Sequence, residues 1–193
     1  MALPERYALP ERYTRPAIIL HWLIAALMIA GVALMWIVDY VPEDRIRLTY
    51  DTHKSIGLTV LGLVIMRVLW RLTHRPPPLP DTYKPWEKRA AHWAHIGLYI
   101  LILALPITGW MHDSAWKGAA ENPLTIFYTI PWFRIPMIEA LDPVTKEYYH
   151  GLFGAIHGYF GYVLYALFFV HVGAALKHQF IDKHPELQRM WRS

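Results

Sequence analysis

Four stretches of the chain are almost entirely apolar, and each is long enough for a helix to cross a lipid bilayer. They cover roughly residues 16–38, 52–72, 90–111 and 149–177. A helix of about 20 apolar residues spans a hydrocarbon core about 30 Å thick. Charged residues collect between these stretches and at the chain ends. The pattern therefore predicts an all-α fold, an integral membrane four-helix bundle.

The connections between these stretches are too short for a separate soluble domain, so residues 1–193 are expected to form one membrane unit. The longest connection, 112–148, is rich in aromatic residues: Trp116, Phe127, Tyr128, Trp132 and Phe133. We expect it to lie in the outer interface as a lid. Aromatic anchoring at the membrane surface explains the same residues.

The basic residues are distributed unequally between the two sides of the predicted bundle. With four spans, the N-terminal tail, the second connection and the C-terminal tail share one side. That side holds 13 of the 19 Lys and Arg: Arg6, Arg12, Arg15, Arg67, Arg71, Arg75, Lys84, Lys88, Arg89, Lys177, Lys183, Arg189 and Arg192. Both termini are therefore predicted to be cytoplasmic. The net charge of +4 arises from the excess of Lys and Arg on this one side. It therefore does not indicate a nucleic-acid partner.

The N-terminal tail and the second connection have unusual sequences. The chain opens with ALPERYALPERY, a tandem duplication in the N-terminal tail for which we predict no function. The second connection, RPPPLPDTYKP, is proline-rich. Such a sequence favours an extended, semi-rigid spacer between the second and third helices.

Four histidines are predicted to lie at two matched depths in the bundle. His157 and His171 are 14 residues apart in the fourth stretch. Fourteen helical residues return to within about 40° of the same face, about 21 Å further along the axis. Because successive helices alternate in direction, His53 lies at the outer level with His157, and His21 lies at the inner level with His171.

Two imidazoles at one depth can supply both axial ligands of a haem iron. The chain has no cysteine, which excludes iron–sulfur clusters and covalently attached c-type haem. The sequence therefore predicts two b-type haems, with His21, His53, His157 and His171 bound to iron. A metal or proton transporter would use histidines as a relay, but no intramembrane Asp or Glu accompanies these four.

Other residues near the two levels are candidates for further contacts. Arg67 and Arg71 at the inner level and Lys54 at the outer level can pair with haem propionates, although snorkelling to lipid phosphates explains all three equally well. His95 is an alternative inner ligand or a propionate or quinone contact, and His150 is an alternative outer ligand. Lys177 and His178 are candidate contacts for a quinone or an anionic substrate.

The remaining histidines are assigned no chemistry. His92 shares the face of His95 at the start of the third stretch, and His74, His112 and His184 are expected at the surface.

Several segments together resemble the bacterial cytochrome b561 family from about residue 12 onward. They are His21-Trp22, HKSIGLTVLGLVIMRVLWR, AHWAHIGLYILILALPITGW and HVGAALKHQFIDKHPELQRMW. The resemblance implies a four-helix bundle of the bacterial inner membrane, with two b haems on His21, His53, His157 and His171. It also implies electron exchange with membrane ubiquinone.

One branch of that family oxidises superoxide to oxygen while it reduces quinone. Such a site needs positive potential to attract the anion. The outer side offers Arg45, Arg47 and Lys54, but Glu43, Asp44 and Asp51 dilute their field.

We therefore expect a quinone-linked electron carrier, with superoxide oxidation as the leading specific reaction. The alternative is a haem-containing subunit that anchors a separate dehydrogenase or receives electrons from a periplasmic donor. Such a subunit would be red but inert until its partner is added, whereas a metal or proton transporter would be colourless.

Overall fold

The computed structural model describes residues 12–191, so most of the duplicated N-terminal segment lies outside the described residues. The long helices are α1 (Arg15–Ile37), α2 (Glu43–Thr73), α3 (Pro85–Ser114) and α5 (Pro143–Leu176). The short elements are η2 (Val38–Tyr40), β1 (Thr125–Ile126), β2 (Ile130–Pro131), α4 (Pro136–Glu139), the π-helical turn η3 (Lys177–Ile181) and α6 (Glu186–Arg189).

Within residues 12–191 four helices are long and apolar enough to cross a membrane, which confirms the predicted helical fold with four candidate spans. The helices extend beyond the apolar stretches, because charged residues continue the same helical turns outside the expected hydrocarbon core. In α2 the first turn carries Glu43 and Asp44 and the last turn carries Arg71. These charges stabilise the corresponding ends of the helix dipole.

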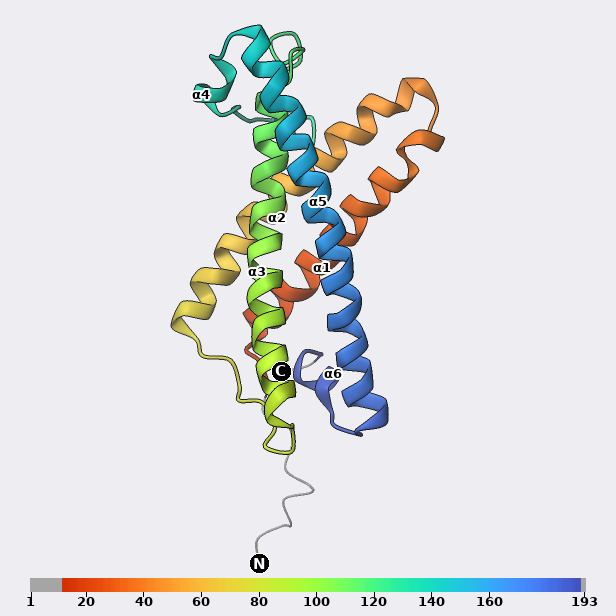
Figure 1. Cartoon of the computed structure of the whole chain (residues 1–193), viewed down its shortest axis with the longest axis vertical. Coiled ribbons are helices and arrows are strands. Elements are labelled where there is room, and N and C mark those ends of the chain that lie inside the picture. Colours follow the sequence, from red (N-terminus) through yellow and green to blue (C-terminus); the bar gives the residue numbers. More distant parts are fainter. Residues whose placement is uncertain (1–11, 192–193) are drawn as a thin grey trace, which may run out of the picture.

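The helices form two antiparallel hairpins. α1 packs on α2, α3 packs on α5, and contacts between α2 and α3 join the hairpins. In Figure 1 the α1–α2 hairpin slants across the α3–α5 hairpin. Buried apolar side chains pack between the two helices of each hairpin. They are Ile24, Ile56, Val60 and Val64 in the α1–α2 hairpin, and Leu101, Leu105 and Leu164 in the α3–α5 hairpin.

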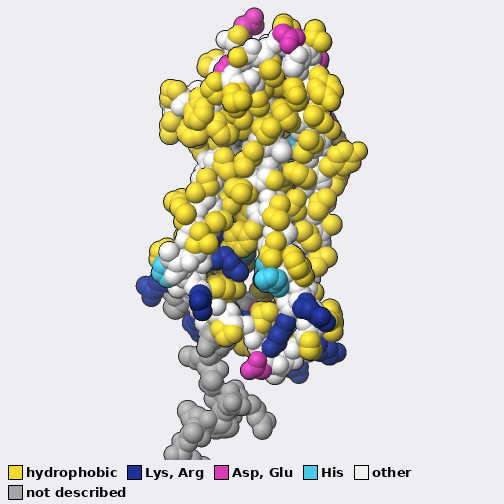
Figure 2. Space-filling view, turned by 60° about the vertical axis from the view of Figure 1, so that its left-hand side comes forward, with side chains coloured by type: hydrophobic (Ala, Val, Ile, Leu, Met, Phe, Trp, Pro, Cys, Tyr) yellow, Lys and Arg dark blue, Asp and Glu magenta, His cyan; other side chains and the backbone are white. Residues whose placement is uncertain are grey.

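The two ends of the bundle differ in charge. We call the end where α1 begins and α5 finishes the terminal end, and the opposite end, which carries the long connection, the loop end. Figure 2 shows a broad apolar band, with Lys and Arg gathered at the terminal end and acidic side chains at the loop end. A cytoplasmic location of the terminal end stays a prediction.

The long connection packs onto α2 at the loop end. β1 and β2 form a small antiparallel hairpin, in which Ile126 pairs with Ile130. The turn between them places Phe127 and Tyr128 at φ 47° and 63°, a region that residues with a Cβ rarely adopt. Ser55 on α2 accepts a hydrogen bond from the backbone N–H of Phe127 at 2.9 Å, which holds this turn against the helix.

Candidate functional site

Two histidines face each other towards the loop end. His53 on α2 and His157 on α5 have ring centroids 6.1 Å apart and ring planes at 86°. His53 Nδ1 lies 2.9 Å from the carbonyl oxygen of Gly31, and His157 Nδ1 lies 3.0 Å from that of Leu105. A carbonyl oxygen can only accept, so each ring donates from Nδ1 and keeps a lone pair on Nε2. That tautomer is the one a metal ligand needs.

Glycines allow these rings to lie close to the neighbouring helices. A Cβ built at Gly109 on α3 would lie 3.1 Å from His157 Cε1, which is closer than ordinary van der Waals contact. A Cβ at Gly31 on α1 would lie 3.7 Å from His53 Nδ1, which is an ordinary contact. The position of His157 therefore depends directly on the absence of a side chain at residue 109.

Three histidines meet towards the terminal end. His21 on α1 and His171 on α5 have ring centroids 6.3 Å apart at 69°, and His95 on α3 lies 5.5 Å from His171 at 66°. Within residues 12–191 these three rings have ring contacts but no hydrogen bond to Nδ1 or Nε2. The structure thus brings together the histidines that the sequence pairs by depth, and it adds His95 to the inner group.

The ring separations within the two predicted pairs are similar. They are 6.1 Å for His53 and His157 and 6.3 Å for His21 and His171, and the His95 and His171 rings are 5.5 Å apart. Two imidazoles at these distances could both reach one metal ion placed between them. Both His21 and His95 therefore remain candidate partners of His171.

A buried ionic network lies beside the loop-end pair. Lys54 Nζ is 2.6 Å from Asp51 Oδ1 and 3.1 Å from Asp113 Oδ1. Arg134 Nε donates to Asp113 Oδ2 at 2.9 Å, and the side chains of Arg134 and Asp113 are only 4% and 8% exposed. Lys54 and Asp113 of this network line a cavity of about 40 Å³ together with His53 and His157. Lys54, a predicted propionate partner, therefore stands at this site but is paired with two carboxylates.

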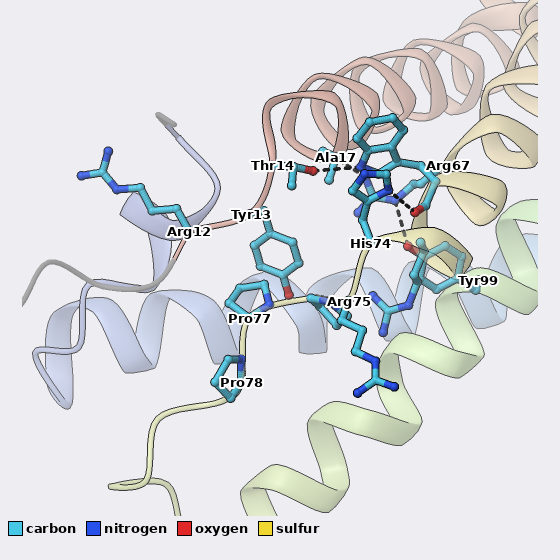
Figure 3. A pocket seen from close by; sticks show the side chains of 13 residues that line it. Arg12, Tyr13, Thr14, Ala17, Arg67, His74, Arg75, Pro77, Pro78 and Tyr99 are labelled. Carbon is cyan, nitrogen blue, oxygen red and sulfur yellow. Dashed lines mark hydrogen bonds between the residues drawn. The ribbon is translucent and has the colours of Figure 1, made fainter.

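The predicted inner propionate partners lie at the terminal end, on the last turns of α2. Arg67 donates from Nη1 to the Ala17 carbonyl at 2.7 Å and from Nε to the Tyr99 hydroxyl at 3.1 Å. The Arg71 guanidinium carbon lies 5.3 Å from the centre of the Tyr99 ring. Arg67, Arg71 and Tyr99 line a cavity of about 410 Å³. Figure 3 shows Arg67 and Tyr99 in its wall.

Lys177 and His178 belong to a cluster that contains two carboxylates, those of Glu87 and Asp182. Lys177 Nζ lies 2.9 Å from Glu87 and 2.7 Å from Asp182, and His178 Nδ1 lies 2.6 Å from Asp182. The hydrogen bond from Lys177 and that from His178 hold the pKa of Asp182 below its usual range. Glu87, His178 and Asp182 are close enough to share a cation, but the Lys177 ammonium already pairs with both carboxylates. These contacts give the cluster little excess positive charge for an anionic substrate.

His150 lies outside the loop-end pair and stacks on His112. Their ring centroids are 3.9 Å apart at 14°, and each Nδ1 contacts the other residue's carbonyl, at 2.8 and 3.0 Å. The expectation that His112 is a surface residue was wrong, because this pair joins the end of α3 to α5. His184 was expected at the surface but is also half-buried, with its ring 5.4 Å from that of Tyr83. His74 is exposed as expected, and His92 is exposed as well.

Asp113 and Arg134 were not recognised as site residues from the sequence. Asp113 is the last acidic residue of α3, and Arg134 lies in a connection whose path the sequence does not define. An Asp next to an apolar helix end, with an isolated Arg in the following loop, is too common a pattern to indicate burial by itself.

Comparisons with known proteins agree with this architecture. A sequence profile describing prokaryotic cytochrome b561 matches residues 12–193. The chain is 34% identical over 190 residues to "Cytochrome b561 homolog 2" of Escherichia coli K12, covering 97% of this chain and 92% of that protein. It is 28% identical over 179 residues to "Cytochrome b561 homolog 1" of the same organism, covering 92% and 95%. It is 27% identical over 175 residues to "Probable superoxide oxidase CybB" of Yersinia pestis, covering 89% and 90%. The chain therefore belongs to the prokaryotic cytochrome b561 family, membrane oxidoreductases that carry electrons on b-type haem.

Proposed function

We propose that this chain carries electrons across the bacterial inner membrane on two b-type haems, one held by His53 and His157 and the other by His21 and His171. The observation that supports this most directly is the separation of the rings in each pair, 6.1 and 6.3 Å. Haem iron with two imidazole ligands supplies one-electron oxidation and reduction when bound.

The spacing along α5 separates the two histidine levels, and apolar side chains between them exclude water. His157 and His171 are 14 residues apart on α5, which is about 21 Å along the helix. Between them Leu164 packs against Leu101 and Leu105 of α3, and these three side chains are buried. The apolar layer excludes water and lowers the local dielectric, which preserves the electrostatic influence of nearby charges.

Charged side chains at each level are suited to hold the propionates of a haem. Arg67 and Arg71 are the proposed contacts at the terminal end, and Lys54 is the proposed contact at the loop end. Lys54 lines the small cavity and pairs with Asp51 and Asp113. A propionate would therefore have to replace one of these two carboxylates as a partner of the ammonium group.

The proposed electron acceptor is ubiquinone, and the leading specific reaction is oxidation of superoxide. In that reaction two superoxide anions each lose one electron and leave as oxygen, and quinone takes up both electrons and two protons to become quinol. The Yersinia relative's name supports the reaction at 27% identity. Arg47 and Lys54 lie at the loop end, both near the Trp116 ring, but Asp51 pairs with both and reduces their attraction for an anion. His95, Lys177 and His178 remain candidate quinone contacts.

A reduced-minus-oxidised spectrum of the purified protein, with haem quantified per chain, tests the assignment. We expect about two b-type haems in the unmodified protein, about one in either His171→Ala or His157→Ala, and two in His95→Ala. Retention of both haems by His171→Ala would refute the pairing. Loss of a haem in His95→Ala, with retention in His21→Ala, would transfer the inner ligand role to His95.

The specific reaction has its own assay. Superoxide generated enzymatically should reduce ubiquinone only when the haem-loaded protein is present, and His157→Ala should lose this activity. A red protein that is inert with superoxide and small donors would contradict the proposed reaction and favour a subunit that needs a partner dehydrogenase.

A further inference from the structure

The cavity of about 410 Å³ at the terminal end has an unusual charge. It opens between the start of α1, the last turns of α2, the proline-rich connection and α3 (Figure 3). Four arginines line it, namely Arg12, Arg67, Arg71 and Arg75, and no Asp or Glu within residues 12–191 is among its lining residues. The like charges of Arg67, Arg71 and Arg75 around one concave space create a positive potential that concentrates anions.

Hydrogen bonds hold the walls of this cavity in place. Arg189 donates from Nη2 to the carbonyls of Pro77 and Pro78, at 3.2 and 2.6 Å, which fixes the proline-rich connection. Trp70 donates from its ring nitrogen to Thr14 Oγ1 at 2.9 Å, which fixes the segment before α1. The cavity is therefore largely preformed, which lowers the entropic cost of binding.

The arginines differ in how fully their donors are used. Arg67 already donates to the Ala17 carbonyl and the Tyr99 hydroxyl. Among the residues that the structure describes, Arg71 and Arg75 have no carboxylate within ion-pair distance. A guanidinium group offers several donors in a planar fork that matches two oxygens of a phosphate.

The cavity lies beside an exposed apolar part of α2. Leu69 and Leu72 flank Arg71 on α2, and both are exposed large apolar side chains. Exposed leucines beside arginines are typical of a helix that leaves the hydrocarbon layer and enters the headgroup layer. A phospholipid that reaches this cavity from the membrane would therefore present its phosphate to the arginines.

We propose that this cavity binds a phosphate group, and that the phosphate belongs to the headgroup of an acidic phospholipid. The alternative source with the same chemistry is soluble phosphate from the adjoining aqueous phase. The proposal does not depend on which histidines hold haem, because Arg75 lies outside the residues assigned to haem.

The test uses the haem-loaded, delipidated full chain in neutral detergent. Binding of short-chain phosphatidylglycerol, phosphatidylcholine and inorganic phosphate is measured by native mass spectrometry and by competition. We expect phosphatidylglycerol to bind at least tenfold more tightly than phosphatidylcholine. Arg75→Gln should weaken phosphatidylglycerol binding about fivefold, the effect of one basic residue near an anionic lipid surface. Arg89→Gln is the matched control, because Arg89 is an exposed arginine of the same end that does not line the cavity.

Arg75→Gln, read out for both lipid and haem, separates this site from haem binding. We expect weaker phosphatidylglycerol binding with an unchanged haem count, because Arg75 is not among the residues assigned to haem. Equal lipid affinity in Arg75→Gln and Arg89→Gln, or equal affinity for the two lipids, would overturn the proposal. Haem loss in Arg75→Gln with unaltered lipid binding would also overturn it, and would assign the arginine to haem. Competition by inorganic phosphate as strong as that by the lipid would keep the phosphate site and reject the lipid as its source.

Discussion

Substitution of Asp113 should release the connection at the loop end. Asp113 accepts the 2.9 Å hydrogen bond from Arg134 Nε, and the Arg134 side chain is 4% exposed. Removal of one partner of a buried ion pair costs about 3–5 kcal/mol. In Asp113→Ala the guanidinium keeps the carbonyls of Ala119 and Asn122, at 2.9 and 2.7 Å, so the lower figure applies. About 3 kcal/mol corresponds to an increase of about 100-fold in the population of the opened connection.

Trypsin can measure this opening at one peptide bond. Cleavage after Arg134 requires its side chain to leave the protein, whereas the Lys117 side chain is 78% exposed. When opening is fast relative to cleavage, the cleavage rate follows the opened population. We therefore expect Asp113→Ala to accelerate cleavage after Arg134 about 100-fold and to leave cleavage after Lys117 nearly unchanged.

Asp44→Ala is the control for loss of an acidic residue at the same end. Asp44 pairs with Arg45 at 3.4 Å, and both side chains are more than half exposed, so the pair contributes less than about 1 kcal/mol. The explanation would be wrong if Asp113→Ala accelerated cleavage after Arg134 no more than Asp44→Ala does. A uniform acceleration at both tryptic sites would also contradict it, because it would indicate global unfolding.

Two further predictions concern the loop-end histidine pair and the terminal end. Gly109→Ala should reduce the haem count from about two to about one per chain, because the new Cβ would lie 3.1 Å from His157 Cε1. Gly62→Ala is the control and should keep both haems, because nothing lies within 4 Å of its Cβ. Equal haem counts in the two variants would refute the argument. The hydrogen bonds that Lys177 and His178 donate hold the pKa of Asp182 below its usual value of 3.8, so its contribution to stability is present above that value and is lost as the pH falls through the lowered pKa. The thermal stability advantage of the unmodified chain over Asp182→Asn should therefore shrink as the pH falls below 3.8. An advantage that grew below pH 3.8 would contradict the assignment.

The depth of each haem-ligand candidate was predictable because depth along a helix depends only on residue number. His157 and His171 are separated by a fixed rise on α5, and His21 and His53 follow from the direction of their helices. The resemblance to the cytochrome b561 family is confirmed. Iron ligation by these four residues stays a prediction.

The direction in which a side chain points around its helix was not predictable to the same degree. His95 was considered only as a competitor for the inner level, and the packing of α3 against α5 brings its ring to 5.5 Å from His171. His112 was expected at the surface, yet the same packing stacks it on His150. Both outcomes depend on the rotation and crossing of neighbouring helices, which a hydropathy pattern does not contain.

The sequence by itself determined the four spans, the two histidine levels and the asymmetry of basic residues, because each is a one-dimensional property of an apolar helix. Only the tertiary structure decided which groups meet between segments far apart in the chain. It paired His53 with the carbonyl of Gly31, buried Arg134 against Asp113, and gathered arginines from separate segments around one cavity. These contacts depend on how the two hairpins cross and how the connections fold back, since backbone carbonyls and loop residues have no periodic signal.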